Sequence, residues 1–177
     1  LNLGFHREWF LISLGAAIGA ITALAAVAFV ELLHAITEGA DHAIETMPLW
    51  FLPLFPMAGA LLTGVFVHFF AAEARGHGVP EVIDAVIRRG GAIRKRVAVV
   101  KAVTSAFTIG SGGSAGAEGP IVQIGSAIGS AVARTLRISR DQVTTLVGCG
   151  AAAGIASVFN APIAGVFFVL EILLRDF

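Results

Sequence analysis

Two long apolar runs dominate the first half of the chain, and each is long enough to cross a lipid bilayer. The first extends from Trp9 to Val30 and the second from Pro48 to Ala72. A helix rises about 1.5 Å per residue, so about 20 apolar residues span a hydrocarbon core of about 30 Å. The first run is too long for the apolar part of a signal peptide and has no clear cleavage pattern. We therefore predict two transmembrane helices joined by the acidic segment Glu31–Thr46.

Charge is distributed asymmetrically around these two runs. The joining segment contains four carboxylates and no Lys or Arg, whereas basic residues follow the second run at Arg75 and within 88–96, and Arg7 precedes the first. Basic loops stay in the cytoplasm, so we expect a cytoplasmic N-terminus and an external acidic loop. The basic cluster 88–96 fits an ordinary cytoplasmic loop, and a lipid or nucleic-acid site is the alternative.

From residue 97 onward the apolar runs become shorter and are separated by small residues. They cover residues 97–109, 120–133, 143–158 and 162–174. Short segments interrupted by Gly or Pro are typical of the discontinuous helices of transporters. Irregular backbone at membrane depth is tolerated only inside protein or beside a wet cavity, so we predict a cavity where the breaks converge. Residues 1–177 are expected to form a single all-α transmembrane domain with about seven helices, several of them broken or re-entrant.

Composition supports a membrane location. The chain is 56% hydrophobic and 14% charged, whereas a soluble domain is about one quarter charged; a very apolar soluble core is the alternative. The 21 glycines fit close approach of membrane helices. The zero net charge provides no basic field for nucleic acid, and the single Cys149 excludes a disulfide within the chain.

A glycine-rich segment that ends at Pro120 carries the first candidate chemistry. Residues 110–120 read Gly-Ser-Gly-Gly-Ser-Ala-Gly-Ala-Glu-Gly-Pro. Pro favours the first position of a helix, so we expect a helix start with unpaired N–H groups at Gly119, Ile121 and Val122. Such groups carry partial positive charge and bind anions.

Glu118 stands at the mouth of this predicted anion site. An ionisable side chain at membrane depth is costly and usually functional. An ionised carboxylate beside the helix start can occupy the anion site and should leave it when protonated, which predicts a gate and a proton carrier. The alternative is that Glu118 only caps the N–H groups of its own helix.

Two further segments predict helix starts. Residues 76–81 read Gly-His-Gly-Val-Pro-Glu and precede an amphipathic pattern, and residues 159–165 place Asn160 as an N-cap two positions before Pro162. Taken alone, the first fits a loop followed by a helix that begins with Pro, and the second fits tight helix packing.

Together these three segments resemble the CLC family of chloride channels and proton-coupled chloride exchangers. The family's glycine–serine–glycine–isoleucine–proline–glutamate is similar to 76–81, its glycine–arginine–glutamate–glycine–proline to 116–120, and its phenylalanine–asparagine–alanine–proline to 159–162, with Glu171 matching a later acid. Order and spacing agree from about residue 9 to 175. The resemblance implies the first half of an inverted-repeat membrane fold that works as a homodimer, in a plasma or bacterial inner membrane.

By this resemblance the chain moves chloride or similar small anions through a glutamate-gated pathway, as a voltage-gated channel or a proton/chloride antiporter, without a cofactor or metal. Glu118 takes the role of the gate. The implied anion-binding residues are His77, Gly78, Val79, Pro80, Ala117, Gly119, Pro120, Ile121 and Val122.

Several positions depart from the family pattern. His77 replaces the usual serine with an imidazole, a side chain that can be charged near neutral pH, and Ala117 replaces the usual arginine. Ile172 stands where bacterial exchangers carry an acid that relays protons. The family's second repeat, which supplies a pore tyrosine, has no counterpart here, and the chain contains no Tyr. Either the chain is a fragment, or half-length chains assemble and supply the second repeat to one another.

Three competing functions remain. Residues 112–116 fit the G-x-S-x-G pattern of a hydrolase, which would make Ser114 a nucleophile and requires a strand before it. Scattered His and Glu residues offer a weak case for metal transport, because their spacing does not match a ligand set. The third is a non-transporting membrane scaffold, or a half-subunit that needs a second repeat to form a pore.

Overall fold

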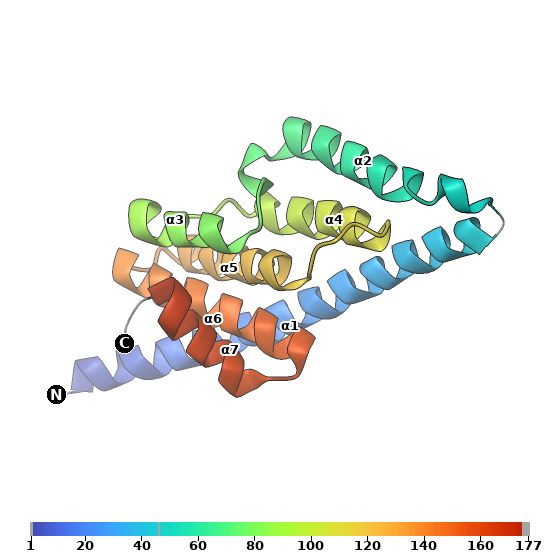
Figure 1. Cartoon of the computed structure of the whole chain (residues 1–177). Coiled ribbons are helices and arrows are strands. Elements are labelled where there is room, and N and C mark those ends of the chain that lie inside the picture. The colour runs from blue at the N-terminus through green and yellow to red at the C-terminus, as the bar shows by residue number, and fades with distance from the viewer. Residues whose placement is uncertain (1, 46, 175–177) are drawn as a thin grey trace.

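The computed structural model describes residues 2–45 and 47–174, and within them the chain is helical and contains no strand. The elements are α1 (Asn2–Glu45), α2 (Leu54–Phe70), α3 (Val79–Arg89), α4 (Arg96–Gly110), α5 (Glu118–Thr135), α6 (Arg140–Phe159) and α7 (Pro162–Phe168), with short 3₁₀ turns at Leu49–Phe51 and Ala72–Ala74 and a π-helix at Val169–Leu174. Seven α-helices in the described residues confirm the predicted all-α class (Figure 1).

The acidic segment after the first apolar run is helical, and its prediction as a loop was wrong. Helix α1 is 44 residues long and continues through Glu31 to Glu45; Thr46 lies outside the described residues. The segment is rich in Leu, Ala, Ile and Glu, which favour helix. Pro48 is the first residue after Glu31 that cannot continue a helix, because it lacks the N–H that the helix needs.

Within residues 2–45 and 47–174, three segments are long and apolar enough to cross a membrane. They are Glu8–Glu45 in α1, Leu49–Phe70 around α2, and Arg140–Phe159 in α6. Large apolar side chains face outward from these helices, including Leu24 at 73% and Phe69 at 75% exposure. Such a surface is stable only against lipid or a protein partner, so the chain is an integral membrane protein. Helices α3 and α7, with 11 and 7 residues, are too short to cross alone.

Helices α5 and α6 pack closely against each other and meet through glycine. A Cβ added at Gly125 would collide with the Gly150 carbonyl, and one added at Gly150 would collide with the Gly125 carbonyl. One turn away on either side, Gly129 lies against Leu146 and Gly154 against Ile121. The pairing is antiparallel, as the short connection between the two helices requires. Small residues at these positions allow the close backbone approach that membrane helices favour.

Asn160 ends α6 and does not cap α7 with its side chain. Its backbone is left-handed, with φ 52° and ψ 37°, a conformation that Asn tolerates better than most residues. Ala161 is the N-cap of α7, and no side chain caps that helix. The predicted break between the two helices is therefore confirmed, but the predicted N-cap role of Asn160 was wrong.

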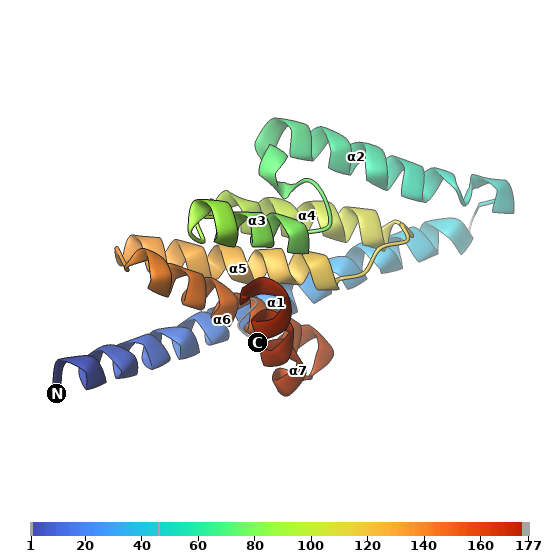
Figure 2. The ribbon, with the colours of Figure 1, turned by 60° about the vertical axis from the view of Figure 1, so that its left-hand side comes forward.

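The arrangement of the shorter helices places two helix starts near the middle of the molecule's length. Both views show α3 and α5 beginning level with the middle of α1 and running toward the same end, while α4 runs the opposite way beside them (Figures 1 and 2). The positive ends of two helix dipoles therefore face the interior from the same side.

Candidate functional site

The two glycine- and proline-containing segments that precede α3 and α5 touch each other. A Cβ added at Gly119 would collide with the carbonyl oxygen of His77, and one added at Gly78 would collide with the carbonyl group of Gly119. Gly78 also has a φ of +104°, which an L side chain would strain. These glycines allow the two backbones to meet, as expected from breaks that converge on one cavity.

A cavity of about 530 Å³ lies beside this contact. It is bounded by α2, the segment before α3, α4 and the loop before α5. Of the predicted site residues, His77, Val79, Glu118, Gly119 and Pro120 line the cavity. The others, Gly78, Pro80, Ala117, Ile121 and Val122, do not line it. The structure therefore assembles part of the predicted set around one hollow.

Helix α5 starts two residues earlier than expected. Its first residue is Glu118, and Pro120 occupies the third position, where its missing N–H still costs little. The Ile121 N–H donates to the carbonyl oxygen of Ala117 at 3.0 Å, and Ile121 and Val122 are fully buried. The prediction of an unpaired N–H group at Ile121 was therefore wrong, and Val122 lies within the helix. Among residues 2–45 and 47–174, the N–H groups of Glu118 and Gly119 have no hydrogen-bond partner.

The Glu118 side chain is exposed at the cavity wall. Its carboxylate folds back toward Gly116, where an added Cβ would collide with Oε2. No hydrogen bond or ion pair joins this carboxylate to another described residue. A carboxylate held only loosely beside unpaired N–H groups is free to move toward or away from them.

Glu81 caps the start of α3, a role that the sequence analysis did not assign. The Gly78 N–H donates to Glu81 Oε2 at 2.7 Å. This carboxylate therefore occupies part of the positive end of α3, which leaves the start of α5 as the more accessible anion site. A Glu three positions after an N-cap is the signal that would have revealed it.

Lys101 is a second residue that the sequence analysis missed. It is 4% exposed and lines the cavity from α4. Its Nζ donates to the carbonyl oxygen of Gly76 at 2.7 Å and to that of Ala74 at 3.3 Å. The ammonium group therefore holds the segment that carries His77 and contributes a positive charge to the cavity wall. The sequence feature that could have identified Lys101 is its charge, the single one within the apolar run 97–109. A charge at membrane depth is costly and is therefore usually functional.

Lys101→Met is expected to destabilise the fold, because it keeps the aliphatic stem but leaves two carbonyl groups without their donor. Hydrogen bonds from charged donors contribute about 1.5–3 kcal/mol each, so we expect a loss of roughly 2–4 kcal/mol in the free energy of unfolding. Denaturant titration in detergent measures it, with the exposed Lys95→Met as the matched control. Equal stability of the two variants would contradict this role.

Of two other candidate groups, Ser114 lines the cavity and Glu171 does not. Ser114 follows helix α4 and not a strand. A nucleophile elbow requires a strand before the serine, so this segment does not have the structure of a hydrolase site. Glu171 lies in the π-helix that follows α7 and is exposed, as is Ile172 beside it.

Comparison with known proteins places the chain in a family. A family model described as "Voltage gated chloride channel" matches residues 59–177, more than half of the chain. The H(+)/Cl(−) exchange transporter ClcA of Citrobacter koseri is 38% identical over 173 residues, covering 92% of this chain and 36% of that protein. The chain spans roughly two fifths of the length of the curated relatives that it matches.

Solved structures agree with this assignment. A eukaryotic CLC transporter matches with a TM-score of 0.76 at 23% identity, over 94% of this chain and 34% of its own, which shows the shared fold. A slow cyanobacterial Cl⁻/H⁺ antiporter matches with a TM-score of 0.67 at 28% identity, over 90% of this chain and 38% of its own. With its paired helix starts, its spanning helices and these matches, the chain belongs to the voltage-gated chloride channel (CLC) family.

Proposed function

We propose that this chain contributes the first half of a glutamate-gated pathway that moves chloride or a similar small anion across a membrane. The observation that carries the proposal is the pair of N–H groups at Glu118 and Gly119, which have no hydrogen-bond partner among the described residues and lie beside a cavity where two helix starts meet. Names of relatives, which include an H(+)/Cl(−) exchange transporter, support the choice of chloride.

The electrostatics of the cavity favour an anion. Unpaired N–H groups at the start of α5 carry partial positive charge, and the buried Lys101 adds a full charge to the cavity wall. An anion that leaves water here exchanges its hydration shell for fixed dipoles. Binding must stay weak enough to permit release, and a few N–H groups beside one lysine suit that requirement.

Glu118 is proposed to be the gate. Its carboxylate lines the cavity and has no hydrogen bond to another described residue, so the ionised form can occupy the anion position. Protonation removes the negative charge and frees the position for a diffusing anion. Ile172, which offers no titratable group where bacterial exchangers carry an acid, favours a route without a coupled proton at that position.

We further propose that residues 1–177 form one domain that needs a second repeat to close the pore, supplied by further chain or by a partner, and that the active unit is a homodimer. The cytoplasmic N-terminus is proposed from the basic residues at 88–96. The second candidate function is a membrane scaffold without transport, to which the exposed apolar side chains of α1 and α2 are equally suited.

Chloride efflux from liposomes, with pH recorded at the same time, tests the proposal. Liposomes that contain this chain alone are compared with liposomes that contain the chain together with a CLC second repeat. We expect efflux in the second sample with little proton movement. Absence of efflux from both samples would favour the scaffold function, and stoichiometric proton movement would show coupled exchange.

His77→Ser is expected to shift selectivity toward chloride. His77 lines the cavity and its backbone touches Gly119, so its imidazole stands where a small hydroxyl would enlarge the site. Permeability ratios of chloride, nitrate and bromide measure the change, and we expect a several-fold shift. His34→Ser on α1, an exposed position, is the control. Identical ratios in the two variants would place residue 77 outside the pathway.

A further inference from the structure

A second hollow, separate from the cavity beside Glu118, is lined mostly by cationic side chains. It has a volume of about 590 Å³ and lies between the segment that enters α4 and the last turns of α5. We call it the basic hollow, and its lining residues are Ile93, Arg94, Lys95, Arg96, Ala131, Arg134 and Thr135. Four of these residues are cationic and none is acidic, so the hollow is a site of positive potential.

Most of this positive charge is not neutralised within the described part of the chain. Arg94 pairs with Glu73, with the Nη1 and Oε1 atoms 3.0 Å apart. Across residues 2–45 and 47–174, no carboxylate lies within ion-pair distance of Lys95, Arg96 or Arg134. Three unpaired cations around one hollow favour an anionic ligand with several acceptor oxygens.

The walls of the basic hollow are fixed relative to each other. The Ile93 N–H donates to Ser130 Oγ at 2.9 Å, and the Ser130 hydroxyl lies 3.4 Å from the Ile93 carbonyl oxygen. Both residues are buried. Ser130 and Arg134 lie one turn apart on the same face of α5, so this anchor holds the entry to α4 beside Arg134. A site that is already ordered loses less entropy when it binds.

Helix dipoles do not set the sign of this site. Helix α4 begins at Arg96 and contributes its positive end, whereas α5 ends at Thr135 and contributes its negative end. These two contributions oppose each other, so the four cationic side chains decide the potential.

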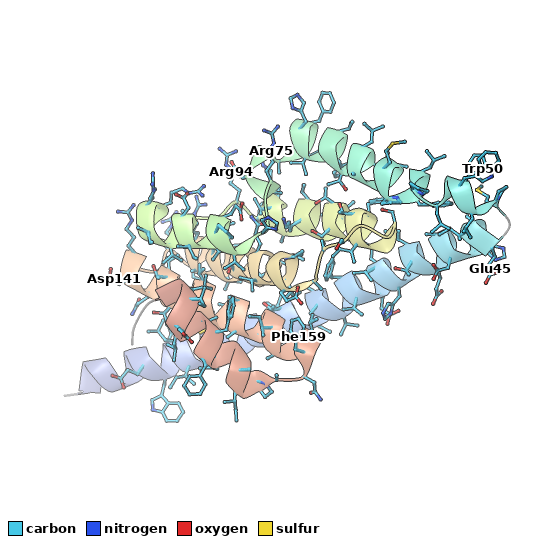
Figure 3. The ribbon with its side chains drawn as sticks, in the orientation of Figure 1. Glu45, Trp50, Arg75, Arg94, Asp141 and Phe159 are labelled. Carbon is cyan, nitrogen blue, oxygen red and sulfur yellow. The ribbon has the colours of Figure 1, made fainter. Side chains whose placement is uncertain are left out.

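The basic hollow lies close in the chain to the start of a helix that is long and apolar enough to span a membrane. Helix α6, long and apolar enough to cross, begins at Arg140 shortly after α5 ends. Figure 3 shows Arg94 beside the start of α4, away from Glu45 and Trp50 at the far end of the molecule. Nearby in the chain, Val99 is 67% exposed and Leu136 is 50% exposed. Exposed apolar side chains close to a basic site suit a ligand with a charged head and an apolar tail.

We propose that the basic hollow binds the phosphate headgroup of an anionic phospholipid, with its acyl chains against exposed apolar residues such as Val99 and Leu136. Lys and Arg side chains donate to the phosphodiester oxygens. Basic pockets between membrane helices at the cytoplasmic boundary recognise anionic headgroups in this way. This site is independent of the anion pathway, because none of its lining residues lines the cavity beside Glu118.

Lipid binding to the purified chain in detergent, measured by native mass spectrometry with phosphatidylglycerol, tests this inference. The double variant Lys95→Gln/Arg96→Gln is expected to raise the apparent Kd on the order of 30-fold, since each of the two cations contributes about 1 kcal/mol near a membrane surface. The matched control Arg88→Gln/Arg89→Gln removes the same charge from α3, where both side chains pair with Asp84, and should change the Kd by less than about threefold. Phosphatidylcholine should bind the unaltered chain at least tenfold more weakly.

Three outcomes would overturn the inference. Equal weakening in the two double variants would mean a diffuse effect of net charge. Equal affinity for phosphatidylglycerol and phosphatidylcholine would mean that the headgroup charge is not recognised. Displacement of the lipid by glycerol phosphate at the same concentration would identify a site for free phosphate compounds and not for lipid.

Discussion

Glu118→Gln is expected to abolish most of the pH dependence of chloride flux. In the unaltered protein, flux should rise as the pH falls, because protonation releases the carboxylate from the start of α5. Gln has nearly the same shape as the protonated acid but carries no charge at any pH, so the variant should conduct at high pH as the unaltered protein does at low pH. Flux into liposomes that contain the chain together with a CLC second repeat, measured across several pH values, gives the profile.

The control for this variant is Glu38→Gln, which removes an exposed carboxylate from α1 far along the chain from the cavity. Its pH profile should match that of the unaltered protein. An unchanged profile in Glu118→Gln, with flux intact, would refute the gate and leave Glu118 as a residue of the helix start only.

Gly119→Ala is expected to remove most transport, by at least about tenfold. The added methyl group would collide with the His77 carbonyl oxygen, so the starts of α3 and α5 must separate. The two colliding atoms, the added Cβ and the His77 carbonyl oxygen, are both bonded directly to the backbone, so neither can move away as a flexible side chain would. Overpacking of this kind costs about 1–3 kcal/mol, so the variant should also unfold at lower denaturant concentration in detergent.

Gly39→Ala is the matched control, because a methyl group at Gly39 in α1 meets nothing within 4 Å. It should keep its transport and gain slightly in stability, since Ala favours helix over Gly. Transport by Gly119→Ala at the level of this control would show that the contact between the two helix starts is not required.

The helices and their breaks could be predicted from the sequence because they follow local rules. Apolar length identified the spans in α1 and α2, and the small residues before Pro80 and Pro120 identified two helix starts. The continuation of α1 past Glu31 does not follow from the charge pattern, because carboxylates indicate exposure to water but not whether the exposed segment is a loop or a helix. Acidic residues outside a bilayer are compatible with a helix, and only Pro or a run of Gly would have stopped it.

The site was predicted in outline but not in its hydrogen bonds. The segments around Gly78 and Gly119 could be expected to lie close together, because interrupted helices at membrane depth place their irregular backbone beside a shared cavity. The pairing of the Ile121 N–H depends on where the helix begins, and the first turn of α5 winds before Pro120 and not after it. Lys101 contacts residues that are distant in the sequence, and Glu81 caps its own helix start; the hydrophobic periodicity reveals neither role.

Anomalous diffraction from crystals of the Glu118→Gln variant soaked in bromide tests the central claim most directly. The claim is that N–H groups at the start of α5, next to the segment before α3, hold an anion inside the molecule. The account predicts a bromide peak in the cavity, within hydrogen-bond distance of the Gly119 N–H and near His77. Bromide found only at the outer surface, with this cavity unoccupied at concentrations that support flux, would contradict it.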